Sequence, residues 1–370
     1  MNWSSYFPTK VFFGSNAVRD NYAVLENLGK RALIVTGKGG SAQRSGALDD
    51  VGRALEQLSI KWEVFNEVEA NPSIQTVRKG AAVARSCQAD FIIGIGGGSP
   101  LDSAKAIAVL ARNEISDEEL FALQFENVLP VIAIPTTAGT GSEVTPFSII
   151  TDPVIKAKAR IYSPKIIAQI AFLDPLYTLD IPARITVDTA VDAYSHALES
   201  YFINKATPIT RLISREAMRI LGPNLKNLNL RATSLTPETR TTMLYGSLLA
   251  GMAISITGTT IPHTMGFSLT YLKDIPHGRA NGMILPAYMD FNYSKTSDST
   301  LMEAVRTSGF DDLKQFRDTM VELCGQAPGF SREEKDLIIS QTLEANNIHN
   351  NIVDPTPEDI GLLLEAILAD

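Results

Sequence analysis

The first half of the chain alternates short apolar runs with helical patterns, and this alternation restricts the fold more than any other feature. Continuous apolar runs at Arg31–Thr36, Asp90–Ile95 and Val131–Ile134 are typical of strands buried on both faces of a parallel sheet. Helical patterns lie between the runs, at Ile74–Ser86 and Leu101–Ala111. Strands that alternate with helices predict βαβ units and a doubly wound, mostly parallel, Rossmann-like sheet.

After about Asp180 the strand patterns fade and long helical patterns take their place. The predicted helices there are Thr186–Tyr201, Pro208–Leu221, Pro237–Ser255, Leu313–Cys324, Ser331–Ala345 and Pro357–Leu368. With 370 residues, the chain exceeds the size at which single cores usually stop growing. We therefore expect an α/β domain over residues 1–180 and an all-α domain over residues 181–370.

Three consecutive glycines follow the apolar run Asp90–Ile95, in the segment Gly96-Gly97-Gly98-Ser99-Pro100-Leu101-Asp102. Glycines let backbone N–H groups approach a phosphate closely, and the N-terminus of the next helix adds a favourable dipole. An ordinary helix start also fits, with Ser99 as N-cap and Asp102 as a capping-box acid. Because capping does not require three glycines, we favour a phosphate-binding loop, although its spacing departs from the G-x-G-x-x-G fingerprint.

A second polar loop, Pro135-Thr-Thr-Ala-Gly-Thr-Gly-Ser-Glu143, follows the apolar run Val131–Ile134. By itself such a loop is an ordinary polar turn. Because it follows a buried strand, as the glycine loop does, we expect both loops at the carboxyl edge of the sheet. Ligands of open α/β sheets bind at that edge.

Three of the four histidines, together with one aspartate, are candidates for a metal site. Asp192 and His196 lie four residues apart in a helical pattern, and therefore on one side of the helix. His263 and His277 flank a later segment. Imidazole and carboxylate groups suit Fe(II) and Zn(II). Singly, each histidine also fits an ordinary core or turn position, whereas a buried Asp192 would be costly unless it were paired or metal-bound.

Composition restricts the cellular context. The formal net charge of −8 argues against nucleic-acid binding, which needs a basic surface. No apolar run reaches the ~18–20 residues that span a bilayer, and the N-terminus lacks the apolar region of a signal peptide. The two cysteines, Cys87 and Cys324, fit a reducing compartment. We expect a cytoplasmic protein that binds neither membranes nor nucleic acids.

Taken together, these motifs resemble the iron-containing (group III) alcohol dehydrogenase family, which shares its architecture with dehydroquinate synthase. The matching segments are Gly96–Asp102, Pro135–Glu143, Asp192-Ala-Tyr-Ser-His196 and Pro276-His277-Gly278-Arg279-Ala280-Asn281. They occur in the family's order and cover residues 96 to 281. The resemblance implies a metal-dependent, NAD(P)-dependent enzyme, and a homodimer, that interconverts small alcohols and aldehydes or ketones by hydride transfer.

The resemblance also implies roles for individual residues. Asp192, His196, His263 and His277 would bind Fe(II), or in some members Zn(II), and the metal would polarise the substrate oxygen. Gly97, Gly98 and Ser99 would hold the cofactor pyrophosphate, with Asp102 beside them. The rest of the nucleotide site would comprise Asn71, Thr136, Thr137, Ser142, Thr145 and Lys158. We expect no catalytic side chain beyond the metal ligands.

The turn after the second predicted strand bears on the choice of nicotinamide cofactor. NAD-preferring members of the family usually place an acidic residue after the threonine that corresponds to Thr36. Here Thr36 is followed by Gly37-Lys38-Gly39-Gly40. Without a carboxylate a 2′-phosphate is not repelled, and Lys38 can attract it. We predict that NADP(H) is preferred over NAD(H), the alternative being a flexible turn that accepts both.

One position departs from the family pattern. Many members carry a histidine four residues after His263, where this chain has Phe267. Phe267, and with it Phe147, is a candidate for an apolar substrate wall, although core packing is the ordinary role of a lone aromatic residue. The alternatives that stay open are a hydroxyacid dehydrogenase or transhydrogenase on the same scaffold. A dehydroquinate synthase-like lyase is disfavoured, because few basic residues lie near the ligands.

Overall fold

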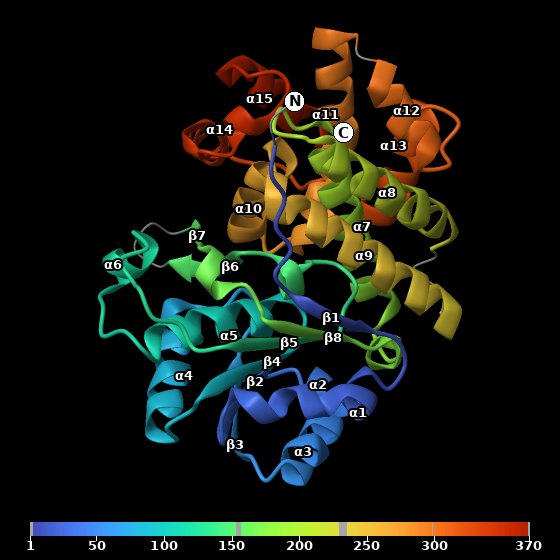
Figure 1. The fold of residues 1–370 in the computed structure, drawn as a ribbon. Helices are drawn as coiled ribbons and strands as arrows, with labels where there is room; N and C mark the ends of the chain where they lie inside the picture. Colours follow the sequence, from blue (N-terminus) through green and yellow to red (C-terminus); the bar gives the residue numbers. More distant parts are fainter. Residues whose placement is uncertain (1–2, 153–156, 229–234, 298, 369–370) are drawn as a thin grey trace. The chain divides into compact units, whose positions relative to one another are not determined.

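The computed structural model describes residues 3–152, 157–228, 235–297 and 299–368 (Figure 1). The chain forms two compact units. The sheet unit consists of Phe7–Ile181 with Leu235–Leu244, and the helical unit consists of Met1–Tyr6, Pro182–Ser234 and Tyr245–Asp370. The prediction of an α/β N-terminal part followed by an all-helical C-terminal part is confirmed.

The sheet unit is built on six strands in the order β1-β8-β5-β4-β2-β3, and every neighbouring pair is parallel. The strands are β1 (Lys10–Phe13), β2 (Arg31–Gly37), β3 (Lys61–Val68), β4 (Phe91–Gly96), β5 (Val131–Pro135) and β8 (Ile170–Leu173). The three apolar runs singled out in the sequence are the buried strands β2, β4 and β5. A separate antiparallel pair, β6 (Phe147–Asp152) and β7 (Ala157–Tyr162), was not predicted.

Helices cover both faces of the six-stranded sheet, as a doubly wound fold requires. Helices α1 (Ala17–Asn21), α2 (Ser41–Arg44) and α3 (Ala47–Gln57) share one apolar core with Ile93 and Ile95 of β4. Gly94 alternates with these residues and faces the other side. There a Cβ at Gly94 would lie 2.9 Å from the Ala104 Cβ of α5 (Gly98–Leu110), which packs beside α4 (Ile74–Ser86).

The helical unit contains α7 (Ala183–Phe202), α8 (Pro208–Asn227), α10 (Ile261–Lys273), α11 (His277–Thr296), α12 (Ser299–Thr307), α13 (Leu313–Cys324), α14 (Arg332–Glu344) and α15 (Pro357–Ala366). Helix α9 (Pro237–Thr257) begins in the sheet unit and ends in the helical unit. The predicted end of the second helix at Leu221 is wrong, because α8 continues through Gly222 and Pro223. Gly222 packs so closely on Ser308 that a Cβ would lie 2.1 Å from its carbonyl oxygen, so the tertiary packing is tight where the helix passes the proline.

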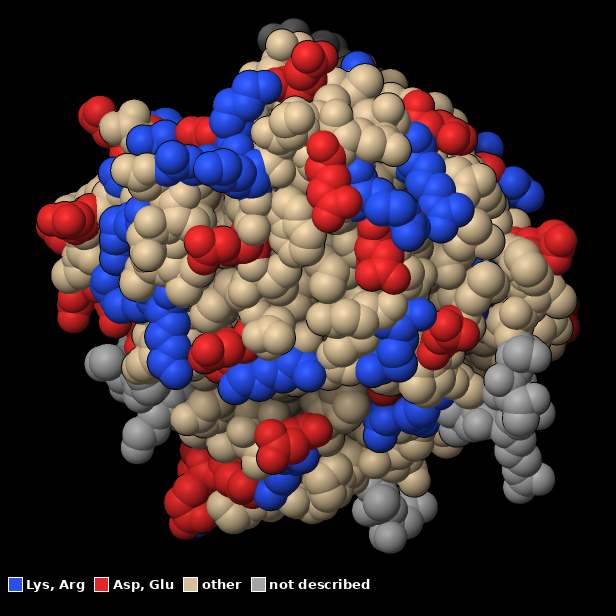
Figure 2. Space-filling view, turned by 90° about the horizontal axis from the view of Figure 1, so that it is seen from below, with Lys and Arg blue, Asp and Glu red and all other residues tan. Residues whose placement is uncertain are grey.

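No single helix in the described part of the chain is long and apolar enough to cross a membrane, although α9 and α10, bent by 105° at their junction, pass that test of length and composition as a pair. Charge is mixed on the face drawn in Figure 2, where basic and acidic side chains are interspersed. That face shows no large patch of one sign.

Candidate active site

The predicted metal ligands lie on three helices of the helical unit. Asp192 and His196 occupy successive turns of α7, His263 is the third residue of α10, and His277 is the first residue of α11. The ligand atoms of Asp192, His196 and His263 all lie within 4.8 Å of one another, and the three side chains are buried. Residues 71 positions apart in the sequence thus form one cluster.

His277 belongs to the same cluster. A residue that was not predicted, Asn281, contacts the ligand atoms of Asp192, His263 and His277. The His277 and His263 rings meet edge to face, with centroids 5.1 Å apart. Asn281 Nδ2 lies 3.0 Å from Asp192 Oδ1, 3.2 Å from His263 Nε2 and 3.3 Å from His277 Nε2. Three predicted ligand atoms therefore converge on one small volume. The spacing of four residues between His277 and Asn281 was the sequence signal for this contact.

Glycines allow the three helices to approach closely enough for this convergence. A Cβ at Gly278 of α11 would lie 1.9 Å from the Asp188 carbonyl oxygen and 2.8 Å from the Asp192 Cβ, both on α7. A Cβ at Gly266 of α10 would lie 2.1 Å from Asn281 Oδ1. At Gly278 the obstacle is backbone, so the absence of a Cβ there is a condition for the cluster, whereas a Cβ at Gly266 would displace the Asn281 side chain.

The electrostatics of the cluster favour a bound cation. Burial alone would raise the pKa of Asp192, but His196, His263 and His277 hold it well below its usual range. Burial lowers the pKa of His263, whereas Glu199 and Asp192 raise it to about 9. A buried carboxylate beside imidazole nitrogens is a donor set that suits a divalent transition-metal ion, so the residues present fit such an ion.

The glycine loop lies in the sheet unit, after β4 and between the ends of β2 and β5. Both loops predicted for the nucleotide follow neighbouring strands and meet at the carboxyl edge. A Cβ at Gly97 would lie 3.2 Å from Thr137 Oγ1, and one at Gly98 would lie 2.7 Å from Thr140 Cγ2. The two loops therefore touch, and the absence of a side chain at Gly97 and Gly98 permits this contact.

The start of α5 differs from the capped helix start considered above. Gly97 is the N-cap residue and no side chain caps the helix, because Ser99 already lies within the first turn. The assignments of Ser99 as N-cap and Asp102 as capping-box acid are therefore wrong. Asp102 instead accepts hydrogen bonds from Ser142 Oγ at 2.6 Å and from the Ile149 N–H at 3.0 Å.

Lys105, which the sequence analysis missed, holds the second loop in place. Its fully buried ammonium group donates to Ser142 Oγ at 2.9 Å, to the Thr145 carbonyl at 2.9 Å and to the Phe147 carbonyl at 2.7 Å. Burial lowers the pKa of Lys105 to about 8, and nearby Asp102 opposes this shift. Lys105 follows Asp102 by three residues on one helix, and that spacing was the available signal.

Lys158 and Asn71, both predicted near the nucleotide, lie on either side of β6. Lys158 pairs with Thr151 across the antiparallel strands. Burial raises the pKa of Asp102, which lies near the start of α5, and the positive charges of Lys105 and Lys158 oppose that rise. Lys158 is therefore close enough to Asp102 for their charges to interact. Asn71 is exposed in a turn with a left-handed backbone, where its carbonyl accepts from Thr151 Oγ1 at 3.1 Å.

The turn after β2 adjoins the glycine loop. Gly37 ends β2, and a Cβ there would lie 3.4 Å from the Pro100 ring. Lys38 follows with an exposed side chain, while its N–H donates to the Val68 carbonyl at 2.8 Å. The predicted cofactor-selecting turn is thus close to the predicted phosphate loop.

The two aromatic candidates for the substrate wall have different surroundings. Phe267 stacks on the His277 ring, with centroids 4.7 Å apart and the planes inclined by 11°. Phe147 packs within the β6–β7 pair, 5.6 Å from the Tyr162 ring and beneath Arg160 at 5.5 Å. Phe267 therefore borders the metal-ligand cluster, whereas Phe147 has packing partners on its own strands.

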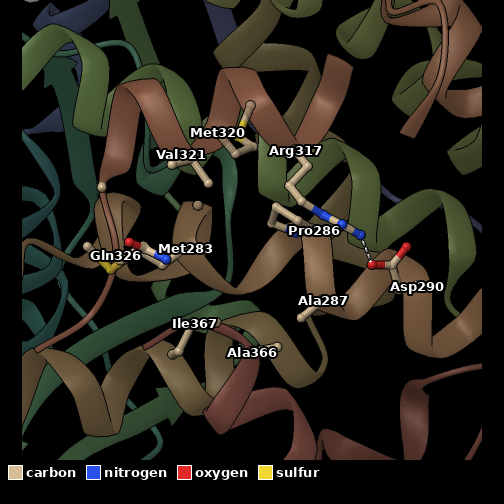
Figure 3. Close-up of a pocket in the computed structure, with 12 residues that line it drawn as sticks. Met283, Pro286, Ala287, Asp290, Arg317, Met320, Val321, Gln326, Ala366 and Ile367 are labelled. Carbon is tan, nitrogen blue, oxygen red and sulfur yellow. Dashed lines mark hydrogen bonds and ion pairs between the residues drawn. The ribbon is translucent and has the colours of Figure 1, made fainter. Parts of the chain in front are cut away.

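A pocket of about 270 Å³ lies elsewhere in the helical unit, between α11, α13 and the chain after α15 (Figure 3). Met283, Met320 and Ile367 line it, and an ion pair between Arg317 and Asp290 closes one side. None of the predicted site residues lines this pocket, so it is distinct from the metal-ligand cluster.

Comparison with known proteins identifies the family. Residues 8–175 match the iron-containing alcohol dehydrogenase family, and residues 186–368 match the C-terminal part of the Fe-containing alcohol dehydrogenase family. The chain belongs to the iron-containing alcohol dehydrogenase family. It is a metal-dependent and NAD(P)-dependent oxidoreductase that acts on alcohols and aldehydes. Asp192, His196 and His263 form the family's metal site, and the predicted family and reaction class are confirmed.

Individual relatives cover most of this iron-containing alcohol dehydrogenase. The 1,3-propanediol dehydrogenase of Klebsiella pneumoniae is 37% identical over 288 residues, which cover 77% of this chain and 74% of that protein. The NADPH-dependent butanol dehydrogenase of Clostridium saccharobutylicum is 34% identical over 297 residues, covering 78% and 74% of the two chains. The crystal structure of an iron-containing alcohol dehydrogenase from Thermotoga maritima has a TM-score of 0.90 and 38% identity, with 99% of both chains covered.

Proposed function

We propose that His277 completes the metal site, so that Asp192, His196, His263 and His277 together bind one Fe(II) or Zn(II) ion. The convergence of Asp192 Oδ1, His263 Nε2 and His277 Nε2 on the Asn281 amide nitrogen, at 3.0 to 3.3 Å, carries this proposal. One carboxylate and three imidazoles suit either ion without a thiolate ligand.

The metal, the nicotinamide cofactor and the protein have different roles in the proposed reaction. A bound divalent ion supplies Lewis-acid polarisation of a substrate oxygen, and the nicotinamide carries the hydride. The chain's own part is to hold the ligands rigidly and largely out of water, since Asp192, His196 and His263 are only 3% to 5% exposed. Electrostatic interactions are stronger where water is excluded.

We assign the nucleotide to the carboxyl edge of the six-stranded sheet. The backbone of Gly97, Gly98 and Ser99, at the N-terminus of α5, is suited to bind the pyrophosphate. The remaining residues that we assign to the nucleotide site are Gly37, Lys38, Asn71, Asp102, Thr136, Thr137, Ser142, Thr145 and Lys158. Within this set Asp102 acts through Ser142, because its oxygens already accept two hydrogen bonds from the chain.

We further propose that NADP(H) is the preferred cofactor. Lys38 is exposed beside the glycine loop, and residues 37–44 contain no carboxylate. A 2′-phosphate near this turn therefore meets a positive charge and no negative one. The NADPH-dependent butanol dehydrogenase among the relatives shows that the family includes such a preference.

The proposed substrates are small apolar alcohols and the corresponding aldehydes. Phe267 presents an aromatic face against His277, where a histidine would offer a hydrogen bond. An apolar wall disfavours phosphorylated or polyhydroxylated substrates, whose polar groups would lose water without gaining a partner.

We also propose a homodimer. Strand β1 is at the edge of the sheet, and its Phe13 side chain is 38% exposed. An edge strand has unpaired backbone groups, and together with an exposed aromatic side chain it is suited to pack against a second copy of the chain. Light scattering after gel filtration tests this proposal, and a monomer at micromolar concentration would contradict it.

The function is tested by metal removal. Chelator-treated enzyme should lose turnover of 1-butanol and butanal, followed at the nicotinamide absorbance band, and Fe(II) or Zn(II) should restore it. His277→Ala should also lower the bound metal per chain, whereas His349→Ala should not, because His349 is 73% exposed and lies outside the cluster. Full turnover without metal would overturn the proposed reaction. Unchanged metal content in His277→Ala would remove His277 from the ligand set.

A further inference from the structure

Glu199 is a buried acid of α7 that the mechanism above does not use. It lies seven residues after Asp192 and three after His196, on the same side of the helix, and its side chain is fully buried. Its Oε1 atom lies at hydrogen-bond distance from His263 Nδ1, and its Oε2 atom accepts from the Thr260 N–H at 2.7 Å. Glu199 thus touches a metal ligand from the side opposite to the ligand cluster.

We propose that Glu199 is a positioning residue that fixes which nitrogen of His263 faces the metal; this inference rests on the proposed metal site. A neutral imidazole carries one N–H, and an ionised carboxylate can only accept. With Glu199 at Nδ1, the proton resides on Nδ1 and the lone pair on Nε2. His263 Nε2 is the atom 3.6 Å from Asp192 Oδ1, so that lone pair points into the ligand cluster.

The second oxygen of Glu199 sets the position of the ring along α10. Thr260 is the N-cap residue of α10, three residues before His263. The bond from the Thr260 N–H therefore holds the carboxylate against the start of the helix that carries the ligand. Thr260 Oγ1 and Tyr288 Oη both donate to Asn351 Oδ1, at 3.3 and 3.0 Å, which restrains this helix start further.

The substitution Glu199→Gln separates this role from plain support of the fold. Gln has nearly the same shape but offers one acceptor and one NH₂ donor. If its oxygen accepts from the Thr260 N–H, its NH₂ group faces His263 Nδ1 and drives the ring proton to Nε2, toward the metal. If its oxygen faces His263, two donors oppose each other at Thr260. Both outcomes weaken metal binding, while the volume of the side chain is kept.

The experiment uses Co(II) as the probe, added to metal-free protein. Its affinity is measured by competition with a chelator, and its d–d absorption reports the ligand geometry. We expect Glu199→Gln and Glu199→Ala to weaken Co(II) binding by about 10- to 100-fold and to change the d–d spectrum. Thr257→Val is the matched control, because it removes the 2.9 Å bond from Thr257, at the end of α9, to Ser200, the neighbour of Glu199 on α7, without touching His263. It should bind Co(II) like the wild type.

A second measurement needs no substitution at residue 199. In the Zn(II)-loaded wild-type protein, nitrogen NMR of the histidine rings should show His263 protonated at Nδ1 and metal-bound at Nε2. A proton on Nε2, or Glu199→Gln with wild-type Co(II) affinity and spectrum, would overturn the role of Glu199 alone. If instead wild type and Asp192→Asn bind Co(II) equally, the proposed metal site fails, and this inference fails with it.

Discussion

Gly278 of α11 lies so close to Asp188 of α7 that a Cβ atom on Gly278 would come within 1.9 Å of the Asp188 carbonyl oxygen. The preceding residue, His277, is a proposed metal ligand, and α7 carries two others. The position of His277 in the cluster therefore depends on a helix contact that only glycine permits.

Gly278→Ala should accordingly disrupt both packing and metal binding. The added methyl group meets backbone, which cannot turn aside as a flexible side chain can, so α11 must move away from α7. We expect the free energy of unfolding to fall by about 3 kcal/mol, the upper end of ordinary overpacking, and the bound metal per chain to fall with it. Urea denaturation and metal analysis measure the two effects. The control is Gly329→Ala, where a Cβ would meet nothing within 4 Å, and equal behaviour of the two variants would contradict this explanation.

The stacking of Phe267 on His277 leads to a prediction about specificity. Phe267→His replaces an apolar ring by a polar one of similar size at the edge of the metal cluster. We expect the ratio of kcat/KM for 1-butanol to that for 1,2-propanediol to fall about tenfold, since apolar contacts of this size are worth ~1–3 kcal/mol. Phe267→Leu keeps the wall apolar and should preserve the ratio. If Phe267→His left the ratio unchanged, Phe267 would be a packing residue only.

The exposed turn at Lys38 allows a test of cofactor choice. Lys38→Asp replaces the attractive charge with a repulsive one near the proposed 2′-phosphate. Since a hydrogen bond to a charged group contributes ~1.5–3 kcal/mol, kcat/KM for NADPH should fall roughly 10- to 100-fold, while the value for NADH should change little. Lys61→Asp makes the same change in net charge at an exposed position, the first residue of β3, and serves as the control. A wild-type enzyme that prefers NADH would defeat the prediction at the outset.

The buried Glu143 predicts a pH dependence of stability in the sheet unit. Burial raises the pKa of Glu143 to about 7, with its own backbone N–H and Lys105 opposing the shift. Because the pKa of Glu143 is higher in the folded than in the unfolded state, the wild-type protein keeps its full stability below about pH 4.5. It loses part of that stability as the pH rises through about 7. One pKa unit corresponds to ~1.4 kcal/mol. The free energy of unfolding of Glu143→Gln should therefore rise by roughly 3 kcal/mol relative to that of the wild type between pH 4.5 and pH 8.

Urea denaturation of the two proteins at pH 4.5 and pH 8 measures that gain. Burial lowers the pKa of Lys105 to about 8. The titration of Lys105 therefore changes the free energy of unfolding at higher pH, where it makes the protein more stable between about pH 8 and pH 10.5. The two windows are therefore separate. A constant difference in stability between wild type and Glu143→Gln across pH 4.5 to 8 would show that residue 143 does not titrate in this range.

Local features of the sequence were sufficient to predict the central strands of the sheet and several of the long helices, but not every element of the fold. The strands β2, β4 and β5 are continuous apolar runs, and a run of that kind is stable only where both faces are covered. The four-residue strands β1 and β8 were missed, because segments so short carry no distinguishing period. Helix α8 was ended too early, since Pro223 normally stops a helix, whereas in the structure it lies inside α8, one residue after the close contact of Gly222 with Ser308.

For the candidate site, too, some features could be predicted from the sequence and others could not. The residue types alone predicted the chemistry: an aspartate and three histidines able to bind a metal, glycines able to admit a phosphate, and Phe267 in place of a histidine. Which of these groups meet in space depends on how the helices and strands pack. Glu199, Asn281 and Lys105 act through partners 64, 89 and 40 residues away, in the contacts with His263, Asp192 and Thr145. Helical spacing tells which residues share a side of one helix, but the contact between two helices depends on packing that no local pattern encodes.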